Sequence, residues 1–123
     1  MALVLCSGID RALVETRRLM LEKAGHEVVT VMDERALVDA CKKHSFDVAV
    51  LGQTISPLSK PRVAMLVKQH CPNVKILELY PPYTGKILED ADSWLVVPAD
   101  VPEGLIERVN ELASKEKSRR QKP

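Results

Sequence analysis

Short runs of apolar residues alternate with longer segments of helical period along the whole chain. Most of these runs are continuous, which is typical of strands that are covered on both faces of a sheet. Alternation of strands with helices favours parallel strands joined by right-handed crossovers. The runs predict five strands, at Ala2–Ser7, Glu27–Met32, Asp47–Leu51, Val74–Leu79 and Ser93–Val97.

The segments between the strands repeat apolar residues every three or four positions, as one face of a helix does. In the first of them, Arg17 is the polar exception on the apolar face. Pro81 and Pro82 exclude a helix directly after the fourth strand, so that a fourth helix must be short. The pattern predicts five helices: Asp10–Ala24, Asp33–His44, a third that ends at Pro72, a short one over Tyr83–Asp90, and Val101–Lys115.

The residues at the helix boundaries agree with these elements. Asp10, Asp33 and Asp100 are expected N-caps, and Pro102 suits the first turn of the last helix. Gly25 follows the first helix, where a left-handed residue is favoured. We therefore expect a flavodoxin-like, doubly wound α/β fold, a three-layer sandwich with five helices around a five-stranded parallel sheet of order 2-1-3-4-5.

Length and composition predict one globular domain, because the chain has 123 residues, 46% of them hydrophobic and 28% charged. We expect the domain to cover residues 1–115 and a disordered basic tail to cover residues 116–123. The net charge of +1 does not suit a domain that binds polyanions. The last nine residues, KEKSRRQKP, could contact nucleic acid or anionic lipid, but a solvated tail is the favoured interpretation.

The remaining composition predicts a cytoplasmic protein without a metal or cofactor. The N-terminus has no basic leader, and no run approaches the roughly 20 apolar residues of a membrane span. Neither a metal-binding histidine pair nor a G-x-G-x-x-G motif occurs. The three cysteines are odd in number and widely spaced, which argues against disulfides: Cys6, Cys41 and Cys71.

Three segments carry a resemblance to a known family. The sequences EKAGHEV and HSFDVAVL, together with the Leu-Val-x-Pro element of Leu95–Pro98, have the spacing found in bacterial response-regulator receiver domains of the chemotaxis type. The resemblance covers about residues 2–113. It implies a signalling module of a two-component phosphorelay, which receives a phosphoryl group on an aspartate.

The residues that the family uses for this chemistry differ at four positions. The resemblance places the phosphate-accepting aspartate at Gly52 and the pair of Mg²⁺-binding acids at Gly8 and Ile9. It places a hydroxyl residue at Tyr80, which is too bulky for that role, and a lysine at Val97. Phosphoryl transfer needs a nucleophile, a cation held by oxygen ligands and neutralisation of charge. The sequence therefore predicts a pseudo-receiver that is not phosphorylated there and is not an enzyme.

Other residues offer weaker routes to chemistry. Asp10 alone would bind Mg²⁺ only weakly, and Asp47 begins its strand at the opposite edge of the sheet. An enzyme with Cys6 as nucleophile is a further hypothesis. Cys6 and Arg11 are one residue closer than in the loop of cysteine phosphatases, and a buried strand cysteine is the favoured interpretation.

Two binding functions remain as alternatives. In receivers, partners and dimer mates use the face of the fourth helix, fifth strand and fifth helix. This face predicts a protein partner, or a second copy, at Tyr80, Tyr83, Ile87 and Trp94, although Trp94 could simply cover the end of the sheet. The other alternative is a small-ligand sensor, with a crevice at the carboxyl ends of the strands lined by Ser7, Gly8, Asp10, Gly52 and Gln53, with Tyr80 at its side.

Overall fold

The computed structural model describes residues 1–98 and 103–121, and beyond Ser114 only their backbone. Five parallel strands form one sheet in the order β2-β1-β3-β4-β5. This order is the expected one, and each strand end lies within one residue of the expectation. The strands are β1 (Leu3–Ser7), β2 (Glu27–Val31), β3 (Val48–Leu51), β4 (Lys75–Tyr80) and β5 (Ser93–Val96).

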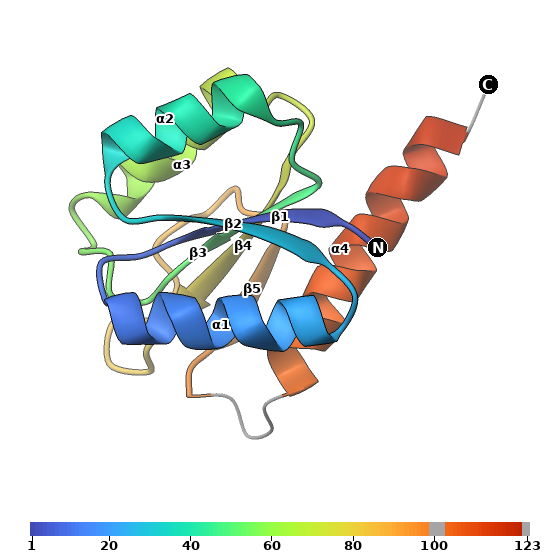
Figure 1. Cartoon of the computed structure of the whole chain (residues 1–123). Helices are drawn as coiled ribbons and strands as arrows, with labels where there is room; N and C mark the ends of the chain where they lie inside the picture. The colour runs from blue at the N-terminus through green and yellow to red at the C-terminus, as the bar shows by residue number, and fades with distance from the viewer. Residues whose placement is uncertain (99–102, 122–123) are drawn as a thin grey trace.

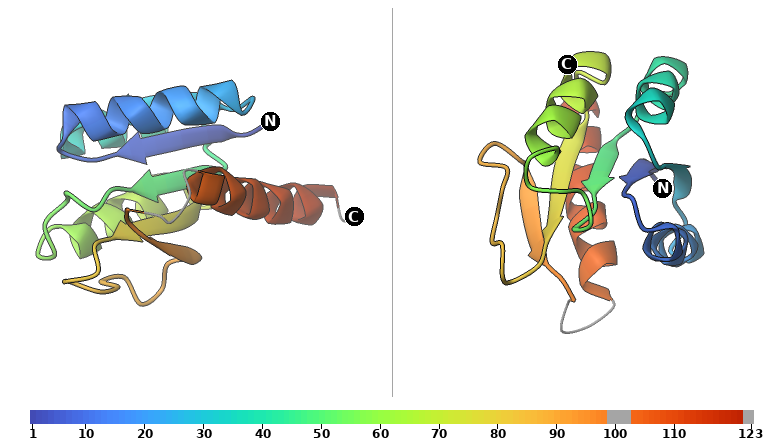
Figure 2. Two further views of the ribbon diagram at one scale, coloured as in Figure 1. Left: turned by 90° about the horizontal axis from the view of Figure 1, so that it is seen from below. Right: turned by 90° about the vertical axis from the view of Figure 1, so that its left-hand side faces the viewer.

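Helices cover both faces of the sheet, which confirms the three-layer flavodoxin-like arrangement (Figure 1, Figure 2). One face packs against α2 and α3, and the other packs against α1 and α4. The described residues contain four helices, where the sequence predicts five. They are α1 (Arg11–Lys23), α2 (Glu34–Lys43), α3 (Lys60–His70) and α4 (Glu103–Gln121).

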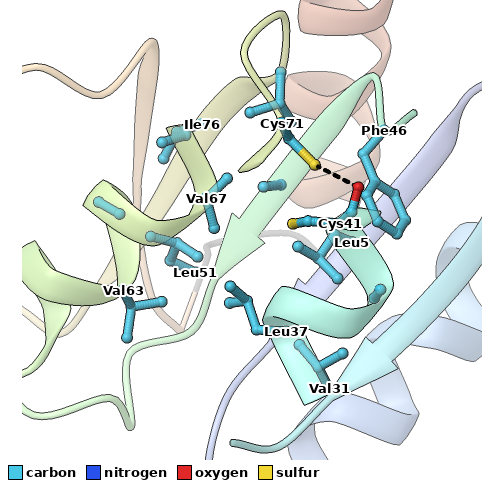
Figure 3. Close-up of a cluster of buried hydrophobic side chains, with 14 of the residues drawn as sticks. Leu5, Val31, Leu37, Cys41, Phe46, Leu51, Val63, Val67, Cys71 and Ile76 are labelled. Carbon is cyan, nitrogen blue, oxygen red and sulfur yellow. Dashed lines mark hydrogen bonds between the residues drawn. The ribbon is translucent and has the colours of Figure 1, made fainter. Parts of the chain in front are cut away.

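Two hydrophobic cores result from this layering. Successive strand residues point to opposite faces, so that Leu5 packs beneath α2 and α3 while Val4 packs beneath α1 and α4. Figure 3 shows the first of these cores, with Leu37 and Val67 reaching the sheet from the two helices above it. Because both faces of the central strands are buried, their sequences are apolar without alternation.

Local capping explains where the first two helices begin. The carboxylate of Asp10 accepts hydrogen bonds from the backbone N–H groups of Ala12 and Leu13, and Asp33 caps α2 through the N–H of Ala36. Gly25 has a φ of 98°, which places it in the left-handed region after α1. The expected caps at Asp10, Asp33 and Gly25 are therefore confirmed, whereas Asp100 lies outside the described residues.

The expected short helix over Tyr83–Asp90 is wrong, because this segment is a loop. Side chains satisfy the backbone groups that a helix would use. The buried carboxylate of Glu78 accepts from the N–H groups of Ile87 and Leu88, and the indole N–H of Trp94 donates to the Leu88 carbonyl at 2.7 Å. Gly85, with a φ of 70°, adds a left-handed turn within the loop.

The last helix is longer than expected and is tied to the start of the chain. Its backbone is helical to Gln121, within the segment expected to be a disordered tail. Leu112 and Ala113 are buried in the core beneath α4. His26 links the start of the chain to α4, because its Nδ1 accepts from the Ala2 N–H at 3.0 Å and its Nε2 lies 2.7 Å from Oδ1 of Asn110.

Candidate functional site

The carboxyl ends of β1 and β3 meet where the strand order reverses. The N–H of Gly52 donates to the carbonyl of Ser7 at 2.9 Å, and the N–H of Ile9 donates to the Thr54 hydroxyl at 3.3 Å. A Cβ on Gly52 would lie 3.7 Å from the Cα of Gly8. The structure thus brings Ser7, Gly8 and Gly52 together, as the sequence predicts for strand ends in this fold.

Arg17 fills the space beside Gly52. A Cβ on Gly52 would approach Nη1 of Arg17 and the Ser7 carbonyl oxygen to 3.0 Å each. Arg17 projects from α1, is only 8% exposed, and donates from Nη2 to Oε1 of Gln53. Burial lowers the pKa of Arg17, while nearby Cys6 and Asp10 raise it. Since a guanidinium keeps its proton in proteins, this corner holds a fixed positive charge.

The carboxylates near the site are occupied or distant. Asp10 caps α1 with its carboxylate, and Asp47 accepts from the N–H of Leu3 at 2.9 Å, at the opposite edge of the sheet. Ile9, where the resemblance to receivers places one of two acids, is 65% exposed. Among the residues described, no three His, Cys, Asp or Glu side chains are grouped so that they could hold a metal ion.

Tyr80 and Val97 lie side by side at the ends of β4 and β5. The N–H of Val97 donates to the Tyr80 carbonyl at 2.9 Å, and Tyr80 is half-buried. Val97 also borders, with Arg17, a cavity of about 180 Å³ between α1 and the start of α4. The position where receivers have a lysine is therefore apolar, and the nearby cation comes from α1 instead.

A buried ion pair escaped the sequence analysis. Nζ of Lys60 lies 3.0 Å from Oε2 of Glu78 and donates to the Leu79 carbonyl at 2.8 Å, and both side chains are fully buried. Burial lowers the pKa of Lys60, and its contact with Glu78 opposes that effect. The position of Glu78 within an apolar run of the sequence is a sign that its charge is buried. The sequence pattern around Lys60 contains no such sign.

Cys6 is poorly suited to be a nucleophile. Its side chain is buried in the core beneath α1 and α4. Burial raises the pKa of Cys6 to about 12, with the nearby Arg17 acting weakly in the other direction. Because the thiolate is the reactive form, a thiol that is inaccessible and protonated is not available for catalysis.

The four candidate interface residues differ in exposure. Tyr83 is 89% exposed, whereas Tyr80, Ile87 and Trp94 are half-buried. Trp94 has a structural role, since its indole N–H bonds the Leu88 carbonyl and its ring lies 4.7 Å from Nζ of Lys86. Tyr83 is therefore the residue of this set most accessible to a partner. None of the described helices has the apolar stretch that crossing a membrane would require.

Comparison with known proteins gives matches only among solved structures. No family model and no curated protein sequence matches the chain. The chemotaxis response regulator CheY4 of Vibrio cholerae superposes with a TM-score of 0.74 at 26% identity, over 91% of this chain and 98% of that one.

Matches with lower sequence identity show a similarity of fold alone. A response regulator protein from Burkholderia pseudomallei, with a phosphorylated aspartic acid, gives a TM-score of 0.74 at 17% identity, over 98% of this chain and 74% of that one. NtrX from Brucella abortus gives 0.85 at 16% identity, with 98% of this chain matching 28% of that protein. The chain therefore has the fold of a response-regulator receiver domain.

Proposed function

We propose that this domain is a receiver-like signalling module that is not phosphorylated on the third strand and acts by protein–protein contact. One observation carries the proposal: the phosphate-accepting position is Gly52, and the guanidinium of Arg17 fills the space beside it. A residue without a side chain offers no nucleophile. The domain would then have no enzymatic step of its own.

The surrounding residues also disfavour the metal ion that phosphoryl transfer needs. Mg²⁺ prefers carboxylate and other oxygen ligands, and Gly8 and Ile9 provide no side-chain oxygen where receivers have two acids. Arg17 adds a buried positive charge at the same corner, which repels a divalent cation. Without phosphoryl transfer at this corner, the domain would remain in one conformational state and would not be switched by phosphorylation.

Incubation with acetyl phosphate and Mg²⁺, followed by intact-mass spectrometry, tests the proposal. We expect no added phosphate on this protein under conditions that phosphorylate a response regulator with its aspartate. That regulator serves as the positive control. A stoichiometric adduct that is stable in acid and labile in base would be an acyl phosphate, and the proposal would be abandoned.

We place the partner surface around Tyr83, beside Tyr80, Ile87 and Trp94. Exposed tyrosine is enriched at interface hot spots, and Tyr83 has the accessibility for this role. Trp94 is unsuitable as a probe because its loss would release the loop. Tyr83→Ala should lose the partners, or the self-association, that the wild type shows in pull-down and sedimentation experiments, while Leu19→Ala, an exposed change on α1, should keep them.

A second candidate function is a small-ligand sensor. The observation that favours it is a cavity of about 330 Å³ bordered by Ser7 and Gly8. The crevice differs from the expected one, because Arg17 fills the side of Gly52 and Gln53, and Asp10 is engaged in capping α1. The open space lies instead on the face covered by α2 and α3.

A further inference from the structure

The cavity beside Ser7 is open to solvent on one side and is lined largely by apolar side chains. It lies between the end of β1, the first turn of α2 and the segment that leads from β3 into α3. Leu37 and Val63, two of its walls, stand at one end of the buried cluster in Figure 3. The apolar walls are Ile9, Met32, Leu37, Ile55 and Val63.

One polar side chain in this wall is open to a ligand. Ser7 lies two residues after Leu5, so that its side chain points to the same face of the sheet, toward α2 and α3. Ser7 as a whole is only 8% exposed, but its hydroxyl oxygen is not buried and makes no hydrogen bond to the described part of the chain. The hydroxyl is therefore available to a polar atom of a ligand, as donor or as acceptor.

Charge at the cavity selects against anions. Among the described residues, the charged ones that border it are Asp33 and Glu34, and none is a lysine or arginine. Asp33 caps α2, and Glu34 pairs with Nε of Arg62 at 2.7 Å. Arg62 neutralises only one of these two carboxylates, so the remaining negative charge disfavours a phosphate or carboxylate ligand.

The volume fits a small molecule. About 330 Å³ is at the lower end of the roughly 300–1,000 Å³ of ligand pockets. It is also about twice the roughly 150 Å³ in which an apolar cavity holds benzene. The space therefore accommodates a ring with substituents.

We propose that this cavity binds a small uncharged molecule with an aromatic or aliphatic body and one hydroxyl or carbonyl group that bonds Ser7. This inference rests on the second candidate function and names its ligand class. Ile55 and the residues that follow it belong to the segment before α3, so an occupant would contact that segment directly.

Phenol and toluene are matched probes, since phenol has a hydroxyl group where toluene has a methyl group of similar size. In titrations followed by amide NMR spectra, both should give saturable shifts confined to the residues around the cavity. Phenol should bind about two- to tenfold more tightly, as one hydrogen bond predicts. Ser7→Ala should weaken phenol to the level of toluene and leave toluene unchanged. Benzoate should not bind.

A second pair of variants keeps the test independent of any folding defect in Ser7→Ala. Ile9 borders the cavity and Leu19 does not, and both side chains are exposed. Ile9→Ala should weaken both probes about threefold or more, from the lost apolar contact, and Leu19→Ala should leave them unchanged.

Absence of saturable shifts with both probes would overturn the inference. So would an equal loss of phenol and toluene in a folded Ser7→Ala protein, or an equal effect of Ile9→Ala and Leu19→Ala. None of these results would affect the proposal that the domain is not phosphorylated, which the mass measurement decides separately.

Discussion

At the scale of single residues, Gly52 is constrained by its neighbours as well as lacking a carboxylate. The contact that a Cβ would make with the Ser7 carbonyl is with backbone inside the sheet, which cannot move aside easily. The contact with Arg17 involves the end of a long side chain, and that side chain can move aside. The Ser7 backbone, rather than the guanidinium, is therefore the neighbour that favours glycine at this position.

Gly52→Ala should lower the free energy of unfolding by about 1–3 kcal/mol, because the added methyl group overpacks a buried corner. Urea unfolding followed by circular dichroism measures this. Gln69→Ala, an exposed change on α3, is the control and should stay within about 0.5 kcal/mol of the wild type. A Gly52→Ala protein as stable as the control would show that Arg17 and the Ser7 backbone make room at no cost.

At the scale of elements, the Lys60–Glu78 pair decides the form of the chain between β4 and β5. Glu78 accepts the N–H groups of Ile87 and Leu88, and Lys60, in the first turn of α3, neutralises its charge. The pair thus connects α3, β4 and the loop that replaces the expected helix. A buried carboxylate without such a cation would be costly.

Lys60→Met should lower the free energy of unfolding by about 3–5 kcal/mol, because it leaves the Glu78 charge buried and unpaired. The double variant Lys60→Met/Glu78→Gln should recover part of this loss. In hydrogen exchange, the amides of Ile87 and Leu88 should lose protection in the single variant.

The exposed pair between Arg62 and Glu34, at 2.7 Å, is a matched control for burial. Arg62→Met should cost less than about 1 kcal/mol, since solvent already screens this pair. Similar losses in Lys60→Met and Arg62→Met would contradict the importance assigned to the buried pair.

At the scale of the whole molecule, His26 connects the start of the chain to the last helix. This ring joins the N–H of Ala2, before β1, to Asn110 in α4. Leu112 and Ala113, further along α4, are buried and pack this helix against the sheet. The packed unit thus extends through these residues of α4.

A chain ending at Lys115 should therefore unfold within about 0.5 kcal/mol of the full chain. A chain ending at Glu111 loses the buried Leu112 side chain and should be less stable by about 2–5 kcal/mol. Thermal unfolding of the three lengths measures this. A loss above about 1 kcal/mol in the longer truncation would mean that residues 116–123 belong to the folded unit.

The sheet order and the strand ends that border the candidate site could be predicted from the amino-acid sequence. Apolar runs, helical periodicity and caps such as Asp10 depend on neighbours within a few residues, so they can be read along the chain. The order of elements then places the ends of β1 and β3 together. The resemblance to receivers assigns Gly8, Ile9 and Gly52 to positions where those domains have acids.

The residues that fill the candidate site could not be predicted, because they come from distant segments of the chain. Arg17 contacts the Gly52 corner from another element, and Lys60 reaches Glu78 across nearly twenty positions of the chain. The unpartnered Ser7 and its cavity likewise depend on how α2 and α3 pack on the sheet. Such contacts are set by packing and charge between distant segments, which local periodicity does not encode. For the same reason the sequence pattern predicts a helix over Tyr83–Asp90, where the structure has a loop held by Glu78 and Trp94.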